Sequence, residues 1–204
     1  MVDTIPIISL SAQILSALTS LALIKKYKFT FFYLLVSILC LSATVEVLGV
    51  YFKEIKQPSQ LLYSVYTFLI FNLIFFLYNQ IIVKKTKYIL VIPIICFNIL
   101  FIFLYIYKLS YFKALIFGFI ITSFYILLYL RQLLLSDEII NYKRLLPFWV
   151  SVGFLVCYLP SVPFFTFIDY MQNRGLFFII YILVTLMHFF IIYGLLCSSK
   201  EEKY

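Results

Sequence analysis

The chain has 204 residues, of which 65% are hydrophobic and only 12% are charged, and its formal net charge at pH 7 is +8. This composition excludes an ordinary soluble domain, because a fold of this length could not bury so much apolar surface away from water. The positive charge does not call for a nucleic-acid partner, since lysine and arginine also anchor membrane proteins to anionic headgroups.

Apolar stretches of about 20 residues, the length that crosses the hydrocarbon core of a bilayer, recur along the chain. The predicted spans are Ile5–Ile24, Thr30–Phe52, Gln60–Val83, Tyr88–Tyr107, Ala114–Leu135, Leu146–Ile168 and Leu176–Cys197. They do not alternate polar and apolar residues as barrel strands do, and a backbone in lipid must satisfy its own hydrogen bonds. The sequence therefore predicts an all-α polytopic membrane protein with one domain, residues 1–204, built as a bundle of seven helices.

The first span has an alternative interpretation as a cleaved signal peptide. The stretch "SALTSLALI" contains small residues at a suitable cleavage spacing. The span lacks a positively charged n-region, however, and its apolar run is longer than a usual h-region. We therefore count it as the first of seven helices.

The basic residues predict the orientation. If the first helix enters from outside, eleven of the 16 lysine and arginine residues fall on the inner side: Lys25, Lys26, Lys28, Lys84, Lys85, Lys87, Arg131, Lys143, Arg144, Lys200 and Lys203. The outer side holds the other five, which are Lys53, Lys56, Lys108, Lys113 and Arg174. Because short cytoplasmic loops are enriched in lysine and arginine, the N-terminus is expected outside and the C-terminus in the cytoplasm.

Glu46, in "LSATVEVLGVYF", is the acidic residue that lies inside a predicted span and away from its ends. An isolated charge at the centre of a bilayer costs about 2.5–3.5 kcal/mol on insertion scales. Such a residue should face the interior of the bundle, where we expect Tyr66 or Gln13 to donate a hydrogen bond to it. Ser42 and Gly49, four residues before and three after, should share its helix face. A structural hydrogen bond between helices remains the alternative to a functional role.

Other polar residues reach a similar depth in the outer half of the predicted bundle. They are Gln13, Tyr63, Tyr66 and Ser161, with Tyr158 and Asn72 somewhat deeper. Together with Glu46 they predict a ligand-binding cavity that opens to the outside. Asn72, Asn98 and the single histidine, His188, are each also candidates for simple hydrogen bonds between helices.

Two prolines predict a hinge in the sixth span. Pro160 and Pro163 lie in its outer half, where each ring removes a backbone donor and clashes with the carbonyl four residues back. A bend or partial unwinding is expected there.

Motifs of catalysis, metal binding and cofactor binding are not found. The four cysteines lie in four different spans without metal-ligand spacing, and the last span lacks a lysine that could hold retinal. No facing aspartates, zinc-protease helix or glycine-rich phosphate loop is present. The sequence therefore predicts no catalytic residues, no metal site and no cofactor, and the protein is not expected to be an enzyme.

The stretches "EVLGVYF", "LLYSVYTFLIFNLIFFLY" and "PFWVSVGFLVCYLPSVPFF" resemble a group of small, largely uncharacterised seven-helix inner-membrane proteins of Bacteroidota. The resemblance implies a sensor-like role in a bacterial inner membrane, and it relates Glu46, Tyr66 and Trp149 to positions of that group. Ile70 and Phe71 stand in the region where members often carry a second acid, so a paired-carboxylate site is not implied.

Two classes of function follow. In the first, the protein is a sensor or receptor-like module that binds a small molecule or lipid in its outer half and relays helix motion to a separate cytoplasmic partner or within a homo-oligomer. In the second, it is a component of a transporter or substrate-capture system. Transporters commonly have internal repeats and helices broken at corresponding places, and neither pattern is found here, which favours the sensor. A pore, an enzyme and an assembly subunit remain as minor alternatives.

Overall fold

The computed structural model describes every residue except 1–3, 84–86, 108–109, 169–173 and 199–204. Seven helices in the described residues are long and apolar enough to cross a membrane. They are α1 (Thr4–Ala22), α2 (Thr30–Glu54), α3 (Gln60–Ile81), α4 (Lys87–Ile106), α5 (Phe112–Leu134), α6 (Leu146–Thr166) and α7 (Phe178–Cys197). Two short 3₁₀ segments, η2 (Asp137–Arg144) and η4 (Arg174–Phe177), precede α6 and α7. The prediction of an all-α bundle with seven apolar helices is confirmed, with each boundary within two residues of its predicted position.

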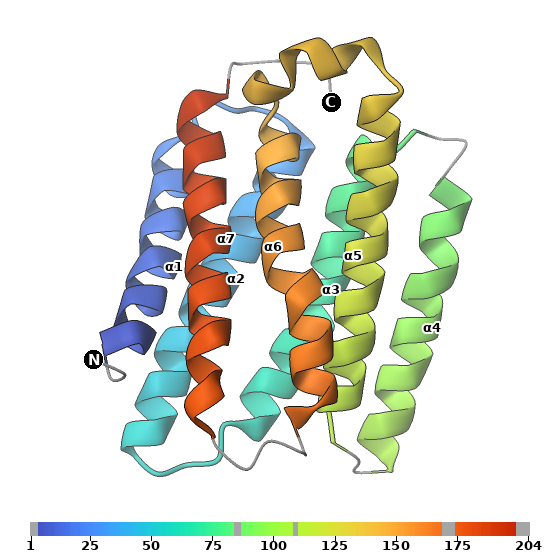
Figure 1. Ribbon diagram of the computed structural model, residues 1–204. Coiled ribbons are helices and arrows are strands. Elements are labelled where there is room, and N and C mark those ends of the chain that lie inside the picture. Colours follow the sequence, from blue (N-terminus) through green and yellow to red (C-terminus); the bar gives the residue numbers. More distant parts are fainter. Residues whose placement is uncertain (1–3, 84–86, 108–109, 169–173, 199–204) are drawn as a thin grey trace.

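The seven helices run alternately up and down (Figure 1), and their contacts arrange all of them except α4 as a ring. α1 packs against α2 and α7, α3 lies between α2 and α5, and α6 lies between α5 and α7. α4 stands outside this ring and packs against α3 and α5. The two termini lie at opposite ends of the bundle, which we call the N-terminal end and the C-terminal end. Helices α2, α4 and α6 end, and α3, α5 and α7 begin, at the N-terminal end (Figure 1).

The tightly packed core belongs mainly to the half of the bundle near the C-terminal end. Its side chains include Phe32, Leu35, Ile74, Phe154 and Ile191, each at most 1% exposed. Tyrosine hydroxyls tie helices together in the same half, as when the buried Tyr78 of α3 pairs with the Ser151 hydroxyl of α6 at 3.0 Å. Large apolar side chains and satisfied hydroxyls thus hold this half of the ring closed.

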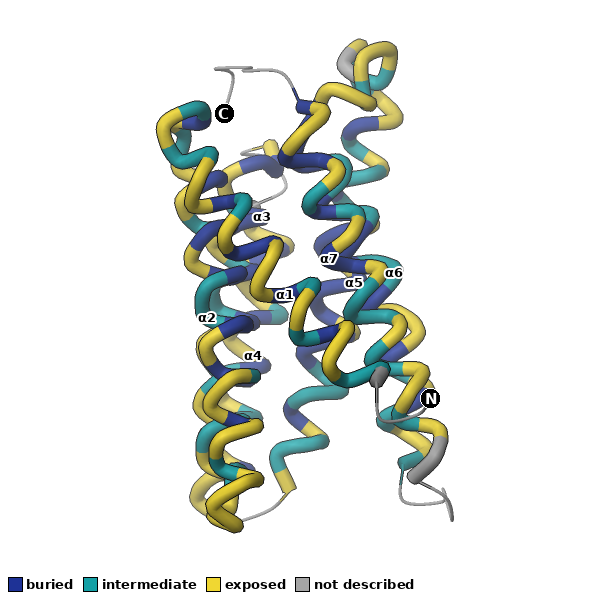
Figure 2. Tube along the Cα trace, turned by 90° about the vertical axis from the view of Figure 1, so that its left-hand side faces the viewer, coloured by how far each residue is buried: buried dark blue, intermediate teal, exposed yellow. Residues whose placement is uncertain are grey.

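The half near the N-terminal end is packed more loosely where α3 and α7 pass through it. The first seven residues of α3, Gln60–Tyr66, include no buried residue, and neither do the first nine of α7, Phe178–Leu186. The buried residues of these helices begin only at Thr67 and Met187. Figure 2 shows the same change along the bundle, with more of the trace intermediate or exposed toward the N-terminal end. Inward-pointing side chains of α3 and α7 at this level are therefore only half-buried, whereas Ala114 of α5 and Ser161 of α6 are buried at the same level.

The two prolines of α6 bend the helix without interrupting it. The helix continues through Pro160 and Pro163 to Thr166, and in Figure 1 its half nearer the N-terminal end is displaced sideways from the other half. The predicted bend is present, whereas the partial unwinding considered as its alternative is not. Ser161 donates a hydrogen bond to the Cys157 carbonyl at 2.6 Å, on the helix turn next to the first proline.

Candidate functional site

Glu46 lies on the face of α2 that packs against α3. Ser42 and Gly49, one turn to either side, are both buried, while Glu46 between them is half-buried. The Tyr66 hydroxyl of α3 lies 3.0 Å from the Ser42 hydroxyl, and the Tyr63 hydroxyl occupies the space beside Gly49 where a Cβ atom would stand. The expectation that Ser42, Glu46 and Gly49 share one face is therefore confirmed, and the carboxylate lies between the two contacts.

The direction of the Ser42–Tyr66 hydrogen bond follows from the proton count. A serine hydroxyl has one hydrogen, and Ser42 donates it to the Ile38 carbonyl at 2.9 Å. Ser42 must then accept from Tyr66, so the Tyr66 proton is directed at Ser42 and away from Glu46. This differs from the expectation that Tyr66 donates to the carboxylate, since sequence spacing could not show that a serine would compete for the proton.

Tyrosines of α3 and α7 lie near the carboxylate, and Tyr111 lies near one of them. Glu46 lies close enough to Tyr63, Tyr66 and Tyr181 to interact with them electrostatically, and Tyr63 interacts in turn with Tyr181 and Tyr111. These residues come from α3, α7 and the residue that precedes α5. No described residue forms an ion pair or a hydrogen bond with the Glu46 side chain. The carboxylate thus lies near three tyrosines, and no described residue neutralises it or donates a hydrogen bond to it.

The position of Glu46 along α2 places it well inside the predicted span. It precedes the end of the helix at Glu54 by eight residues, which is about 12 Å at 1.5 Å per residue. At this depth a bare carboxylate is unfavourable, so it should hold a proton or face a cation. The surrounding half-buried tyrosines belong to the loosely packed half of the bundle described above.

The other predicted ligand-binding residues are distributed over the bundle. Tyr158 of α6 is the next neighbour of this cluster, because it interacts electrostatically with Tyr66 and with Tyr78. Asn72 lies on the side of α3 that meets α4, where it exchanges two hydrogen bonds of 3.0 and 3.2 Å with Asn98. Ser161 is buried and bonded within its own helix.

Gln13 belongs to a buried polar stripe on α1, formed with Ser9, Ser16 and Ser20. It is 6% exposed, and its backbone carbonyl accepts the Ser16 proton at 2.8 Å. The structure brings Glu46, Tyr63 and Tyr66 together with Tyr158 beside them. It places Asn72, Ser161 and Gln13 in separate contacts.

His188 of α7 pairs with α1. Its Nδ1 atom lies 2.7 Å from the Ser16 hydroxyl, and that hydroxyl already donates its proton to the Gln13 carbonyl. His188 therefore carries its proton on Nδ1 and donates to Ser16, and its buried Nε2 atom has no described partner. The sequence suggested a helix-to-helix hydrogen bond for this residue but could not name its partner.

Tyr181 and Tyr111 are the members of the cluster that the sequence did not single out. Both lie near the first turn of a helix that starts at the N-terminal end, at the level of Tyr63. Both would have been found if the depth of every tyrosine had been counted from the end of its helix, including tyrosines close to the interface. Tyrosine is frequent in this chain, with 18 residues, so depth alone selects too many candidates.

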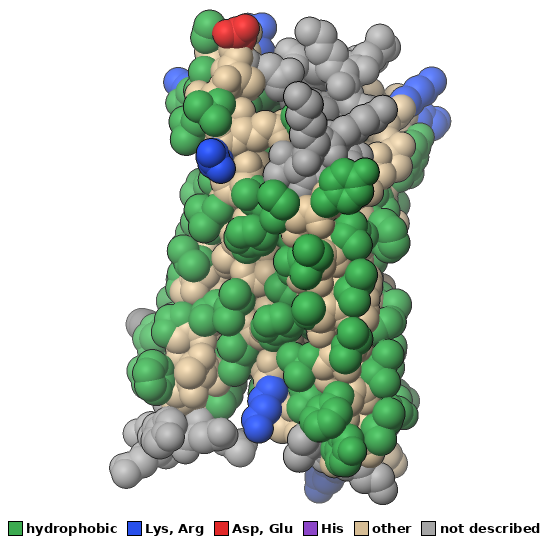
Figure 3. Space-filling view, turned by 90° about the vertical axis from the view of Figure 1, so that its right-hand side faces the viewer, with side chains coloured by type: hydrophobic (Ala, Val, Ile, Leu, Met, Phe, Trp, Pro, Cys, Tyr) green, Lys and Arg blue, Asp and Glu red, His purple; other side chains and the backbone are tan. Residues whose placement is uncertain are grey.

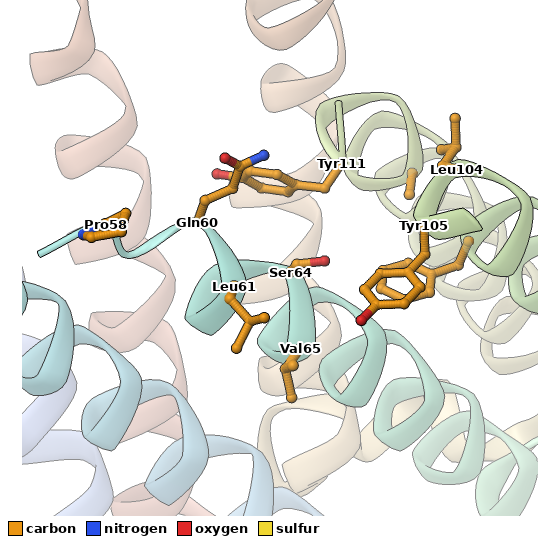
Figure 4. Close-up of a pocket in the computed structure, with 10 residues that line it drawn as sticks. Pro58, Gln60, Leu61, Ser64, Val65, Leu104, Tyr105 and Tyr111 are labelled. Atoms are coloured by element: carbon orange, nitrogen blue, oxygen red, sulfur yellow. The ribbon is translucent and has the colours of Figure 1, made fainter. Parts of the chain in front are cut away.

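A groove of about 510 Å³ lies on the opposite face of α3, between α3, α4 and the start of α5 (Figure 4). Its lining includes Leu61, Val65 and Tyr111, and none of the predicted ligand-binding residues. Tyr111 is common to the groove and to the tyrosine cluster around Glu46.

No family model matches the chain, and no curated protein or solved structure is detectably similar to it. In the described residues no group of three or more histidine, cysteine, aspartate or glutamate side chains is placed to hold a metal ion. The candidate site is therefore defined by its own geometry, a half-buried carboxylate among hydroxyls in the half of the bundle near the N-terminal end.

Proposed function

We propose that the protein is a receptor-like module of a bacterial inner membrane that binds a small ligand at Glu46. One observation carries the proposal: the carboxylate lies inside a membrane span, faces hydroxyl groups of other helices, and receives no hydrogen bond from a described residue. Ionisable residues inside membrane spans are rare and commonly mark functional sites. The loosely packed first turns of α3 and α7 leave the same region half-buried.

The orientation that we propose places the N-terminal end of the bundle outside the cell and the C-terminal end in the cytoplasm. The support is the distribution of lysine and arginine, eleven against five in favour of the C-terminal end. Glu46 then lies in the outer half of the membrane, where a ligand from the exterior or from the outer leaflet can reach it.

The chemistry around Glu46 favours a cationic ligand. A carboxylate can only accept hydrogen bonds, and the Tyr66 proton is already used by Ser42. A ligand that supplies both hydrogen-bond donors and a positive charge complements this set best, and a small amine has both. Tyrosine rings such as those of Tyr63 and Tyr181 can also face a cation.

A column of hydroxyl groups offers a route for the signal. Tyr158 lies near both Tyr66 and Tyr78, and the Tyr78 hydroxyl is hydrogen-bonded to Ser151 in the tightly packed half. The segment η2 contacts α5, α6 and α7 at the C-terminal end. We propose that a ligand at Glu46 shifts α3 against α6, and that a separate cytoplasmic partner reads the change at η2.

Co-purification tests the proposal with whatever ligand the cell supplies. Wild-type protein, Glu46→Gln and the control Glu54→Gln are purified in parallel, and small molecules extracted from each are compared by mass spectrometry. Glu54 is an exposed carboxylate at the end of the same helix.

We expect a cationic species in the wild-type and Glu54→Gln extracts that falls at least about tenfold in Glu46→Gln, since a hydrogen bond to a charged group contributes about 1.5–3 kcal/mol. Equal amounts in all three extracts would exclude Glu46 as the binding group. A species that depends on Glu46 but has no positive charge would support the binding site and exclude an amine as its ligand.

A further inference from the structure

The groove between α3, α4 and the start of α5 adjoins the Glu46 cluster through Tyr111, and its other lining residues do not belong to that cluster. Its apolar walls come from Leu61 and Val65 of α3 and from Phe101 and Leu104 of α4, with the fully buried Ala114 of α5 behind them. Leu61 is 69% exposed and Val65 is 50% exposed, so the groove opens sideways on the surface of the bundle. In a membrane this surface faces lipid.

The groove is closed toward the middle of the membrane. The ring of Phe101 packs against that of Phe68 with 5.1 Å between their centroids, and the Asn72–Asn98 pair joins α3 to α4 just beyond. Along α3 the lining extends from Gln60 to Val65, about 8 Å at the helical rise. An occupant must therefore enter from the side or from the N-terminal end.

The mouth of the groove is polar. Gln60, Ser64, Tyr105 and Tyr111 contribute the polar groups of the lining, and Figure 4 shows Gln60 and Tyr111 at the end of α3 nearest the connection that carries Pro58. A groove with apolar walls and a polar rim matches an amphiphile whose polar head lies at the membrane surface and whose tail lies in the groove.

Two exposed lysines lie close in the chain to residues at the mouth of the groove. Lys113 is exposed in the first turn of α5, two residues after Tyr111, and Lys56 is exposed two residues before Pro58. The face of the molecule that carries α4 is otherwise covered largely with hydrophobic side chains, with basic side chains toward its ends (Figure 3). An anionic headgroup would be attracted to a rim of this charge.

We infer that this groove holds the acyl chain of an anionic phospholipid, with the phosphate near Lys113 and the polar rim. Because Tyr111 belongs both to the groove and to the cluster around Glu46, the lipid lies next to the proposed ligand site without being part of it.

Native mass spectrometry tests the inference with two probes, phosphatidylglycerol and the zwitterionic phosphatidylcholine, each added at the same concentration to the full-length protein in detergent. Val65→Trp fills the groove, and Leu69→Trp is its matched control, because Leu69 is exposed on the same helix and is absent from the lining. Lys113→Gln removes the rim charge, and Lys53→Gln removes an exposed charge from α2 at the same end.

We expect wild-type protein and Leu69→Trp to retain phosphatidylglycerol in preference to phosphatidylcholine. Val65→Trp should retain at least fivefold less phosphatidylglycerol than the wild-type protein. Lys113→Gln should remove the preference while Lys53→Gln keeps it. Equal retention by Val65→Trp and Leu69→Trp would overturn the site. If Val65→Trp loses the lipid but the wild-type protein shows no preference between the two lipids, the inference of an anionic headgroup is overturned. Circular dichroism of each variant confirms that it is folded, and none of these changes touches Glu46.

Discussion

The hydroxyl of Tyr63 on α3 fills the place beside Gly49 of α2 that a side chain would otherwise occupy. A Cβ atom added to Gly49 would collide with this hydroxyl and would lie 3.0 Å from the ring carbon that carries it. The absence of a side chain at residue 49 therefore sets how closely Tyr63 approaches α2. Glu46, one turn away, lies next to the position fixed by this contact.

Gly49→Ala should destabilise the protein by about 1–3 kcal/mol, the usual range for overpacking. Tyr63→Phe removes the colliding oxygen, so the double variant should recover part of that loss. Thermal unfolding in detergent of the two single variants and the double variant measures the coupling. Strictly additive losses would show that the two residues are not in contact.

Ser16→Ala should cost about 1 kcal/mol, because it leaves the Nδ1 proton of His188 without an acceptor in the bundle interior. Ser20→Ala is the matched control, since Ser20 is buried on the same helix and donates its hydrogen bond to the Ala17 carbonyl of that helix. The free energy of unfolding of the two variants is compared. A loss in Ser20→Ala as large as in Ser16→Ala would contradict the Ser16–His188 contact.

The protonation of His188 has a direct spectroscopic test. The chain contains one histidine, so ¹⁵N-histidine labelling gives a single pair of imidazole nitrogen resonances. In wild-type protein these should report a proton on Nδ1 and none on Nε2. The opposite tautomer would mean that Ser16 donates to the ring and not to Gln13.

Asn72 and Asn98 should show positive coupling in a double-mutant cycle. Replacing either by leucine leaves the other amide without its partner, whereas replacing both removes the polar pair altogether. The coupling energy should lie between about 0.6 kcal/mol, the average measured for hydrogen bonds between membrane helices, and about 1.7 kcal/mol, the largest value measured. A coupling energy of zero would indicate that α4 is held against α3 by other contacts.

Fusion reporters test the proposed orientation. A fluorescent protein attached after Tyr204 should fold in the cytoplasm, and alkaline phosphatase inserted at the exposed Pro58 should be active outside. The same result is expected for an insertion at Asn173, a position outside the described residues. Activity of phosphatase at the C-terminus would reverse the placement of the Glu46 site.

The sequence was sufficient to predict the helices because hydropathy and helix length are both read along the chain. It also placed Ser42, Glu46 and Gly49 on one face, since that relationship depends only on helical periodicity. The prolines of α6 were recognised for the same local reason. Depth in the membrane, counted from helix ends, correctly brought Tyr63 and Tyr66 to the level of Glu46.

The order of helices around the bundle could not be predicted from depth. Asn72 lies at a suitable level for the cluster but points toward α4, which stands outside the ring, and it pairs there with Asn98. Gln13 belongs to the side of α1 on which Ser16 meets His188. Two residues at one depth can face different neighbours, and only the packing of the helices decides which contact forms.

A density map of the protein purified in its native lipids would show directly whether Glu46 is a ligand-binding group. We predict density for a small molecule within hydrogen-bonding distance of the Glu46 carboxylate and next to Tyr63 and Tyr66, and its loss from the map of Glu46→Gln with the helices unmoved. A carboxylate that instead projects into lipid, or that is fully hydrogen-bonded by other side chains with no additional density beside it, would contradict a ligand-binding role for Glu46.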